Sequence, residues 1–263
     1  MNKTKLMGIL NVTPDSCYDQ GKWFDPLQAI KRGIQIYEEG ADWLDIGGES
    51  TRPNAQIISV EEELKRVINV LKTLKKEIPI PISIDTMKSE VALAALSEGA
   101  QLINDVSGFR DPKMCQVAVQ SQVPICIMHM HETPATMQNQ PFYKEGIISF
   151  LCSWFKEKIE YLLSIGIKQE NIIIDPGFGF GKTVADNVKI VQNLHEIQKL
   201  GFPVLVGLSR KSFLGKLIHK DYQGLLAATL AANTLAIRSD INFIRVHDVK
   251  EHREIIDLIE AMK

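Results

Sequence analysis

Cations gather at the ends of two apolar runs in the last third of the chain. Arg210 and Lys211 stand side by side directly after one run, with a serine on each side of the pair, and Arg245 and His247 close the next run. An Arg side chain offers a planar fork for phosphate oxygens, and a Lys side chain offers a mobile point charge. This grouping predicts a site for an anion, with a diphosphate as the best match.

Acids and amides end other apolar runs. Asp85, Asn104 and Asp175 each follow an isoleucine directly, and Asp45 lies inside a fourth run. Burying such a group without a partner costs roughly 2–7 kcal/mol. Internal salt bridges would supply partners, and so would a flat heterocycle that carries amino and ring N–H donors. The sequence therefore predicts an acid-lined lobe opposite the cations, with Asn11 as an oxygen ligand for Mg²⁺.

All these residues hold the same place relative to the predicted elements. Apolar strand-like runs alternate strictly with segments of helical spacing. The strand-like runs are Leu6–Val12, Ala41–Ile46, Ile80–Asp85, Gln101–Val106, Val123–His129, Asn171–Asp175, Pro203–Ser209 and Ile241–His247. The helical segments are Pro26–Glu39, Val60–Lys76, Ser89–Glu98, Lys113–Ser121, Glu145–Ser164, Ala185–Leu200, Leu225–Arg238 and Glu251–Met262.

This alternation predicts the fold. Strands that are apolar on both faces and alternate with helices indicate a parallel sheet covered by helices. Eight such units favour an α/β protein with a (β/α)₈ TIM barrel, as a single domain over residues 1–263. An open Rossmann-type sheet is the alternative, but the first strand-to-helix turn, NVTPDSCYDQG, lacks the G-x-G-x-x-G fingerprint. Barrel sites lie at the C-terminal ends of the strands, where every run carries a polar residue.

Composition narrows the partners. The 263 residues include 30 basic and 32 acidic side chains, for a formal net charge of −2. This balance argues against the broad positive surface that binding to nucleic acid requires. The four cysteines lack C-x-x-C spacing, which favours reduced thiols. The apolar part of the N-terminus is too short for a secretory signal, and no stretch approaches the ~20 apolar residues that span a bilayer. We predict a cytoplasmic protein with small-molecule partners and neither a nucleic-acid nor a membrane partner.

Several motifs admit a second interpretation. GFGFGKT at 177–183 resembles a phosphate-binding P-loop, but Pro176 replaces a required glycine, so the glycines predict a sharp turn close to a ligand. HMH at 129–131 has no third metal ligand within reach in the sequence. His195, His219 and His252 lie among charges and are predicted to be on the surface. GGESTRPNA and NVTPDS are either plain surface loops or mobile covers over the site.

Short blocks of the sequence together resemble the dihydropteroate synthase family. The blocks are MGILNVTPDS, DIGGESTRP, SIDT, IND, MHM, DPGFGFGK, SRKS and RVHDV, in that family's order, from Met7 to Val249. The resemblance implies a (β/α)₈ barrel that condenses 6-hydroxymethyl-7,8-dihydropterin diphosphate with 4-aminobenzoate. The products would be 7,8-dihydropteroate and pyrophosphate, with Mg²⁺ as cofactor and a homodimer as the assembly.

The resemblance also implies a role for individual residues. The pterin ring would be held by Asp85, Asn104, Asp175 and Lys211, with Met128 as a wall, and the diphosphate and Mg²⁺ by Asn11, Arg245 and His247, with Asp45 nearby. The aminobenzoate pocket would comprise Thr51, Arg52, Pro53, Phe180 and Ser212, and the first mobile loop would carry Asp15, Cys17 and Asp19. Catalysis would depend on Asp85, Lys211, Arg245 and His247.

The sequence departs from the family pattern at two positions. Cys17 stands where the family has Phe beside the aminobenzoate, and Asn54 replaces a glycine in the second loop. We expect altered affinity for aminobenzoate and for sulfonamides that imitate it, which kinetics of Cys17→Phe would test. Two alternative functions are a methyltetrahydrofolate-dependent corrinoid methyltransferase domain and an inactive pterin-binding paralogue.

Overall fold

Short parallel strands form one sheet in the computed structural model of this chain, which describes residues 3–13, 25–51, 55–134, 136–137 and 141–262. The strands are β1 (Lys5–Asn11), β2 (Trp43–Gly47), β3 (Ile82–Asp85), β4 (Leu102–Asp105), β5 (Ile125–Met128), β6 (Ile172–Asp175), β7 (Leu205–Val206) and β8 (Phe243–Val246). Each strand lies within its predicted run or extends it by one residue. The strand predictions are therefore confirmed.

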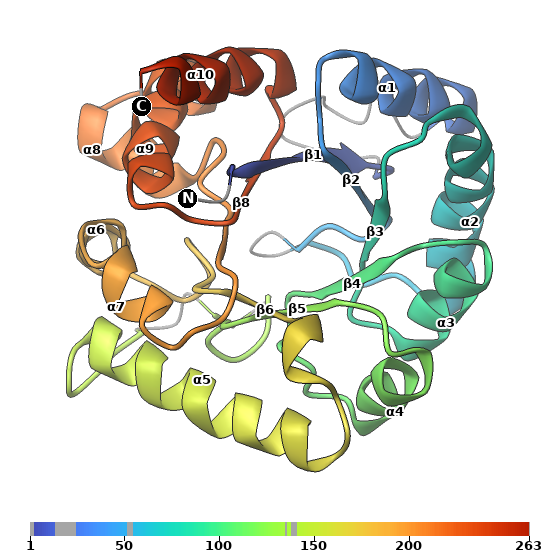
Figure 1. The fold of residues 1–263 in the computed structure, drawn as a ribbon, viewed down its shortest axis with the longest axis horizontal. Coiled ribbons are helices and arrows are strands. Elements are labelled where there is room, and N and C mark those ends of the chain that lie inside the picture. Colours follow the sequence, from blue (N-terminus) through green and yellow to red (C-terminus); the bar gives the residue numbers. More distant parts are fainter. Residues whose placement is uncertain (1–2, 14–24, 52–54, 135, 138–140, 263) are drawn as a thin grey trace.

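The sheet curls into a barrel. Its strand order is β6-β5-β4-β3-β2-β1-β8-β7, and a single parallel bridge between Ile174 and Val204 joins the two edges. At this seam the Ile174 N–H donates to the Pro203 carbonyl at 2.9 Å. Figure 1 shows the strands as an inner ring and the helices around them. The predicted single-domain (β/α)₈ barrel is confirmed.

Each strand is followed by one helix or, after β6 and β7, by two. They are α1 (Pro26–Glu38), α2 (Val60–Glu77), α3 (Ser89–Ser97), α4 (Pro112–Ser121), α5 (Ile147–Ser164), α6 (Val184–Gln192), α7 (Leu194–Gln198), α8 (Ser212–Ile218), α9 (Leu226–Arg238) and α10 (Val249–Ala261). Two short 3₁₀ turns, Gln169–Asn171 and Tyr222–Leu225, precede β6 and α9. The run pattern predicted no helical segment where α8 lies.

The predicted helix Ala185–Leu200 is wrong as one continuous element. Asn193 interrupts it with a φ of −124° and a ψ of 27°, and this residue ends α6 and begins α7. Its side-chain amide donates to the Lys189 carbonyl at 2.8 Å. Asn competes in this way with the helical backbone hydrogen bonds, which is why it disfavours helix interiors.

Local signals explain where the helices begin and end. Asp25 and Ser59 accept hydrogen bonds from the first turns of α1 and α2, and Thr183 forms a reciprocal capping box with Asp186 at the start of α6. Gly40, Gly99 and Gly166 adopt positive φ angles after α1, α3 and α5. The sequence predicted this left-handed conformation for all three glycines.

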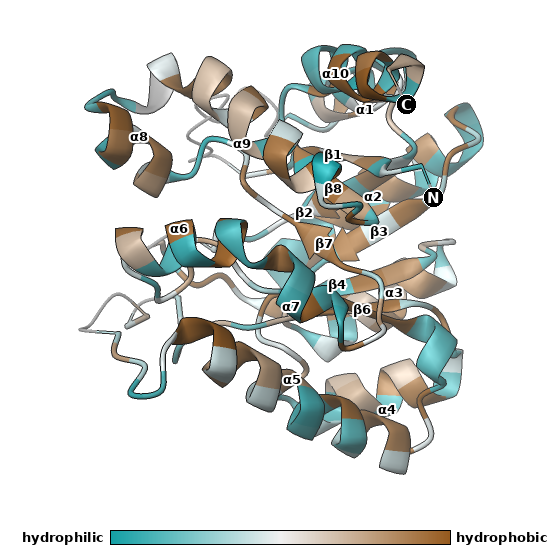
Figure 2. Cartoon of the chain, turned by 60° about the vertical axis from the view of Figure 1, so that its left-hand side comes forward, coloured by the Kyte–Doolittle hydropathy of each residue, from teal (hydrophilic) through white to brown (hydrophobic). Residues whose placement is uncertain are grey.

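Apolar side chains fill two layers of the core. The larger layer lies between the strands and the helices, and much of the central sheet is brown, that is hydrophobic, in Figure 2. A smaller cluster fills the barrel interior near the N-terminal strand ends: Met7, Leu102, Cys126, Ile173, Leu205 and Phe243. This cluster fills the N-terminal end of the barrel, and the polar residues lie at the opposite end, where the strands terminate.

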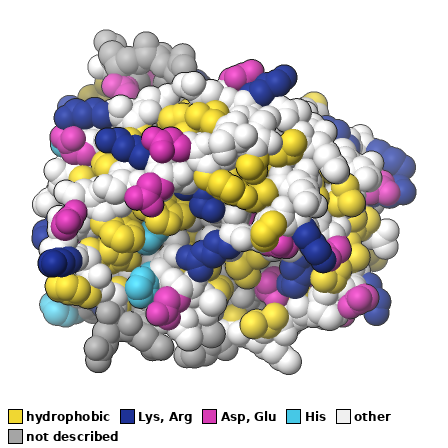
Figure 3. Space-filling view, turned by 90° about the horizontal axis from the view of Figure 1, so that it is seen from below, with side chains coloured by type: hydrophobic (Ala, Val, Ile, Leu, Met, Phe, Trp, Pro, Cys, Tyr) yellow, Lys and Arg dark blue, Asp and Glu magenta, His cyan; other side chains and the backbone are white. Residues whose placement is uncertain are grey.

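The outer surface is mixed in character. On the face shown in Figure 3, acidic and basic side chains are interspersed with apolar ones and do not gather by sign. Among the described residues, no helix combines the length and the apolar character that a membrane crossing requires.

The predicted surface position of His252 is wrong. His195 and His219 are exposed, but the His252 side chain is buried where α10 packs against α9. Its Nδ1–H donates to the Asp248 carbonyl at 2.6 Å, and Nε2 accepts from the Asn233 side-chain amide at 2.8 Å. These two partners satisfy the neutral ring, and burial lowers the pKa of His252.

Candidate active site

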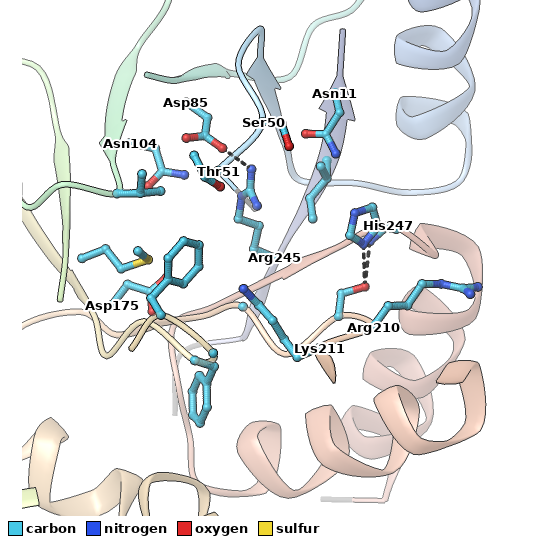
Figure 4. Close-up of a pocket in the computed structure, with 18 of the residues that line it drawn as sticks. Asn11, Ser50, Thr51, Asp85, Asn104, Asp175, Arg210, Lys211, Arg245 and His247 are labelled. Atoms are coloured by element: carbon cyan, nitrogen blue, oxygen red, sulfur yellow. Dashed lines mark hydrogen bonds and ion pairs between the residues drawn. The ribbon is translucent and has the colours of Figure 1, made fainter. Parts of the chain in front are cut away.

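A cavity of about 360 Å³ opens at the C-terminal ends of the strands. Of the residues proposed for binding or catalysis, eleven that the structure describes line it: Asn11, Thr51, Asp85, Asn104, Met128, Asp175, Phe180, Lys211, Ser212, Arg245 and His247. Figure 4 shows that their side chains come from opposite sides of the barrel. Barrel closure thus brings together residues that the sequence spreads over its whole length.

Arg245 lies at the centre of a charge network. Its Nε donates to Oδ2 of Asp45 and its Nη2 donates to Oδ2 of Asp85, each at 2.6 Å. Asp45 is fully buried beneath the cavity, where the Asn104 side-chain amide also donates to Oδ2 at 3.0 Å. Salt bridges, one of the two alternatives left open by the sequence, therefore satisfy much of the acid lobe.

This network corrects the predicted separation of charges. The acids and the bases were expected in opposite lobes, but Arg245 pairs with Asp85, as Figure 4 shows, and also with Asp45. Although burial lowers the pKa of Arg245, the charges of Asp45 and Asp85 outweigh it and raise that pKa. Burial, opposed by Arg245, raises the pKa of Asp85 to about 7.

Asp175 completes the acidic side of the cavity at the end of β6. Its Oδ1 accepts the Gly177 N–H at 2.7 Å, a bond made possible by the turn that follows the strand. Burial raises the pKa of Asp175 to about 6, while this hydrogen bond and Lys211 oppose the shift. The carboxylate can therefore accept hydrogen bonds from N–H donors of a ligand at neutral pH.

The two adjacent cations at the end of β7 have different partners. Arg210 makes a two-pronged ion pair with Asp248, at 2.9 and 2.8 Å, and its guanidinium points away from Lys211 (Figure 4). Arg210 lines the cavity as predicted, but the sequence did not reveal that Asp248 is an ion-pair partner of its guanidinium. Lys211 instead extends into the cavity, with Nζ 4.2 Å from the centre of the Phe180 ring. Burial lowers the pKa of Lys211 to about 8.

His247 is oriented by a serine from the neighbouring strand end. The His247 backbone N–H donates to the Ser209 hydroxyl oxygen at 3.2 Å, and that hydroxyl lies 2.9 Å from the ring Nδ1. With the hydroxyl donating to Nδ1, the neutral ring carries its proton on Nε2. His247 lines the cavity together with Lys211 and Arg245, and this set of side chains suits an anion.

The described geometry matches a known family. The profile described as pterin binding enzyme covers residues 7–247. The dihydropteroate synthase of Haemophilus influenzae is 40% identical over 98% of this chain and 93% of its own length. This chain belongs to the dihydropteroate synthase family.

Solved structures of the family share the whole barrel. A sulfonamide drug complex of Yersinia pestis dihydropteroate synthase is 38% identical, with a TM-score of 0.96 over 99% of this chain and 94% of that one. The Xanthomonas albilineans dihydropteroate synthase with 4-aminobenzoic acid is 39% identical, with a TM-score of 0.92 over 99% of this chain and 93% of that one. The family assignment and the barrel rest on agreement over nearly the full length.

Five predicted site residues lie outside the described part of the chain. They are Asp15, Cys17, Asp19, Arg52 and Pro53. Their roles in the dihydropteroate synthase site remain predictions.

The sequence reasoning missed two charged residues near the cavity. Glu49 lines it and pairs with Lys88 at 2.9 Å, and Lys88 also binds the fully buried Glu63 at 2.6 Å. Lys182 is a buried lysine in the segment that follows β6, and burial lowers its pKa to about 7. Glu49 and Lys182 both lie inside the sequence blocks that resemble the family, in GGES and FGK. The spacing of residues in these blocks does not distinguish a buried charged side chain from an exposed one.

The oxygen and nitrogen donors that line the cavity fit a weakly held divalent cation. In the described ranges, no group of three or more His, Cys, Asp or Glu side chains could hold a metal by itself. Asn11 and His247 line the same cavity, and an amide oxygen is a ligand that Mg²⁺ accepts. Such an ion takes most of its other ligands from water and from the phosphate oxygens of the substrate.

Proposed function

We propose that this cavity condenses 6-hydroxymethyl-7,8-dihydropterin diphosphate with 4-aminobenzoate and releases pyrophosphate. The observation that carries the proposal is one cavity lined by Asp85 and Asp175 and also by Lys211, His247 and Arg245, with Arg245 paired to Asp45 and Asp85. Acids suit the N–H donors of a pterin, and cations suit a diphosphate. Membership of the dihydropteroate synthase family supports the same reaction.

Asp85, Asn104 and Asp175 would hold the pterin ring. All three side chains are at least half-buried at the ends of β3, β4 and β6, where carboxylate and amide oxygens can accept from ring N–H and amino groups. Met128 would form an apolar wall, and Lys211 would contribute a donor from across the cavity. The buried position of the carboxylates excludes water, which makes each hydrogen bond to the ring more selective.

Arg245, His247 and Asn11 would hold the diphosphate. Arg245 provides a fixed positive charge at the centre of the cavity, and His247 provides an N–H donor oriented by Ser209. Mg²⁺, held in part by the Asn11 amide oxygen, would offset negative charge on the phosphates. Stabilising the charge that builds up on departing pyrophosphate is the main help that the protein gives to C–O cleavage.

The reaction exchanges one bond of the pterin methylene carbon for another. The C–O bond to the diphosphate breaks and its electron pair leaves with pyrophosphate, and the amine nitrogen of 4-aminobenzoate forms the new C–N bond and loses a proton. Thr51, Phe180 and Ser212 would hold the aminobenzoate beside that carbon. Holding both reactants in one cavity supplies the orientation that a bimolecular reaction in water lacks.

Neither alternative activity is favoured by a specific observation. A methyltetrahydrofolate-dependent methyltransferase has no diphosphate to bind, so it would leave Lys211 and His247 without their proposed task. The cytoplasmic location and the homodimer remain predictions from the sequence and the resemblance.

One assay tests the proposed reaction. Pyrophosphate release from the pterin diphosphate is measured with and without 4-aminobenzoate and with and without Mg²⁺. We expect release that requires both additions and forms 7,8-dihydropteroate in equal amount. Release that is independent of the arylamine would contradict the proposal.

A further inference from the structure

Lys182 is a buried lysine whose ammonium group is enclosed by acceptors. Nζ lies 2.9 Å from the Gly177 carbonyl, 3.1 Å from the Phe180 carbonyl, and 3.2 and 3.0 Å from the carbonyl and ring Nδ1 of His129. The residue is 4% exposed and does not line the cavity. Burial lowers the pKa of Lys182 to about 7, and the charged form has three N–H donors for these four acceptors, so at least one donor is shared.

The acceptors belong to two segments that approach each other closely. His129 follows β5, whereas Gly177 and Phe180 lie in the turn after β6. A Cβ atom added to Gly177 would lie 2.0 Å from the His129 carbonyl oxygen, so the two backbones are in direct contact there. The carbonyl oxygens of His129, Gly177 and Phe180 thus converge on one buried position, and each buried carbonyl requires a hydrogen-bond donor. Lys182 Nζ lies within hydrogen-bond distance of all three.

The ring of His129 is held in the form that accepts. It packs edge-on against Phe150 and Trp154, with ring centres 5.3 and 5.1 Å away. Burial, together with the nearby Lys182, lowers the pKa of His129 to about 2, so the ring is neutral. Nδ1 is then free to accept from the ammonium while the proton resides on Nε2.

The turn tied down by Lys182 carries part of the cavity wall. Phe178, Gly179 and Phe180 line the cavity, and the Phe180 ring lies below the Lys211 ammonium at 4.2 Å. The Gly179 N–H donates to the side-chain oxygen of Asn187 at 2.8 Å, which anchors the same turn from α6. The positive φ angles of Gly177, Gly179 and Gly181 allow the chain to turn this sharply.

We propose that Lys182 is a positioning residue that fixes the turn after β6 and thereby places Phe180 beneath Lys211 and against the aminobenzoate. Lys182 touches no substrate and acts through the carbonyls of Gly177 and Phe180. The inference rests on the proposed function, because the aminobenzoate role of Phe180 is assigned there. It adds a specificity-determining contact that the cavity lining by itself does not reveal.

The first test compares Lys182→Met with Lys189→Met, an exposed lysine on α6 as a matched control. In Lys182→Met we expect the KM for 4-aminobenzoate to rise about tenfold or more, with the KM for the pterin diphosphate changed by less than about threefold. Lys189→Met should behave like the wild type. A folded Lys182→Met protein with the wild-type KM for 4-aminobenzoate would overturn the proposal.

A double-mutant cycle with Phe180→Ala identifies the route of the effect. If Lys182 acts through Phe180, adding Lys182→Met to Phe180→Ala should raise the KM for 4-aminobenzoate by less than about twofold. Effects that multiply in full would mean that Lys182 acts elsewhere, and would contradict the proposal.

Hydrogen exchange of the ligand-free protein separates this inference from the proposed reaction. Backbone amides of residues 177–182 should exchange faster in Lys182→Met than in Lys189→Met, whatever reaction the protein catalyses. If Lys182→Met does not fold, Asn187→Ala, which removes the acceptor of Gly179, should show the same faster exchange and a raised KM for 4-aminobenzoate. Unchanged exchange and KM in the folded variant would overturn the positioning role. A wild type without arylamine-dependent release would instead refute the proposed function alone.

Discussion

At the residue scale, the site depends on the positive charge of Arg245, which is paired with two carboxylates before any ligand binds. Arg245 is held by Asp45 and Asp85 at 2.6 Å each. Paired in this way, the guanidinium does not have to be ordered when the diphosphate arrives, so the entropy cost of binding is lower. The same pairing keeps the buried Asp45 carboxylate from lacking a counter-charge.

Replacing Arg245 by Met should impair both catalysis and stability. We expect kcat/KM for the pterin diphosphate to fall by about 100-fold or more, because charge on the leaving pyrophosphate loses its central partner. The free energy of unfolding should fall by about 3–5 kcal/mol, since a buried carboxylate loses its cation. Steady-state kinetics and urea unfolding check these values, with the exposed Arg238→Met as control. A variant with wild-type kcat/KM would refute the role of Arg245.

The shifted acids and Lys211 predict a bell-shaped pH profile. Burial raises the pKa values of Asp175 and Asp85 to about 6 and about 7, so both carboxylates gain their charge as pH rises through that range. Burial lowers the pKa of Lys211 to about 8, so its charge is lost above that pH. Because kcat/KM reports the free enzyme, it should rise through about pH 6–7 and fall above about pH 8.

Lys211→Arg tests which residue sets the alkaline limb. A guanidinium stays protonated far above pH 8, so the residual activity of this variant should lose the fall above that pH. Persistence of the same fall would assign the alkaline limb to another group.

At the scale of elements, one partly buried lysine joins two loops and a helix. Lys88, at the start of α3, pairs with Glu49 after β2 and with Glu63 in α2. Burial by itself would lower the pKa of Lys88, but its hydrogen bonds to Glu63 and Glu49 outweigh burial and raise it. This triad holds the base of the segment that carries Thr51 against the barrel.

Lys88→Met should destabilise the protein far more than the loss of a surface pair. The Glu63 side chain is fully buried, so loss of its cation should lower the free energy of unfolding by about 3–5 kcal/mol. Lys72→Met is the matched control, since Lys72 and Glu98 form an exposed pair worth at most about 1 kcal/mol. Urea unfolding of both variants decides the matter. Equal small losses would show that the triad is not a structural anchor.

At the scale of the whole molecule, the site exists only when the barrel is closed. The cavity draws residues from the ends of strands on every side of the sheet, and the seam between β6 and β7 consists of one bridge. A ligand that bridges these strand ends binds the folded chain and not the unfolded one. Its binding is therefore linked to global stability.

The pterin diphosphate should raise the melting temperature of the protein. At a concentration of about 100 times Kd, binding adds about 2.7 kcal/mol to the free energy of unfolding. For a chain of this size that corresponds to an increase of roughly 5–10 °C. Thermal unfolding with and without the ligand measures the shift, and Arg245→Met should reduce it. No shift at saturating ligand would count against the assigned binding site.

The sequence by itself determined the barrel and the candidate residues. Strand and helix periods are local properties, so the alternation of apolar runs could be read without a structure, and barrel sites lie at the C-terminal ends of strands. This reasoning located Asp85, Asp175 and Lys211 in the cavity region. The break at Asn193 escaped it, because a single polar residue weakens a helical pattern without erasing it.

Only the tertiary structure decided which charges are partners. Arg245 binds carboxylates 200 and 160 positions away, Arg210 binds Asp248, and Lys182 binds carbonyls of two segments. Choice of partner depends on distances of a few ångströms that barrel closure sets, and charges alone do not reveal those distances. Burial of His252 and Lys182 follows the same rule, since a polar residue is buried only where the fold brings acceptors or donors to it.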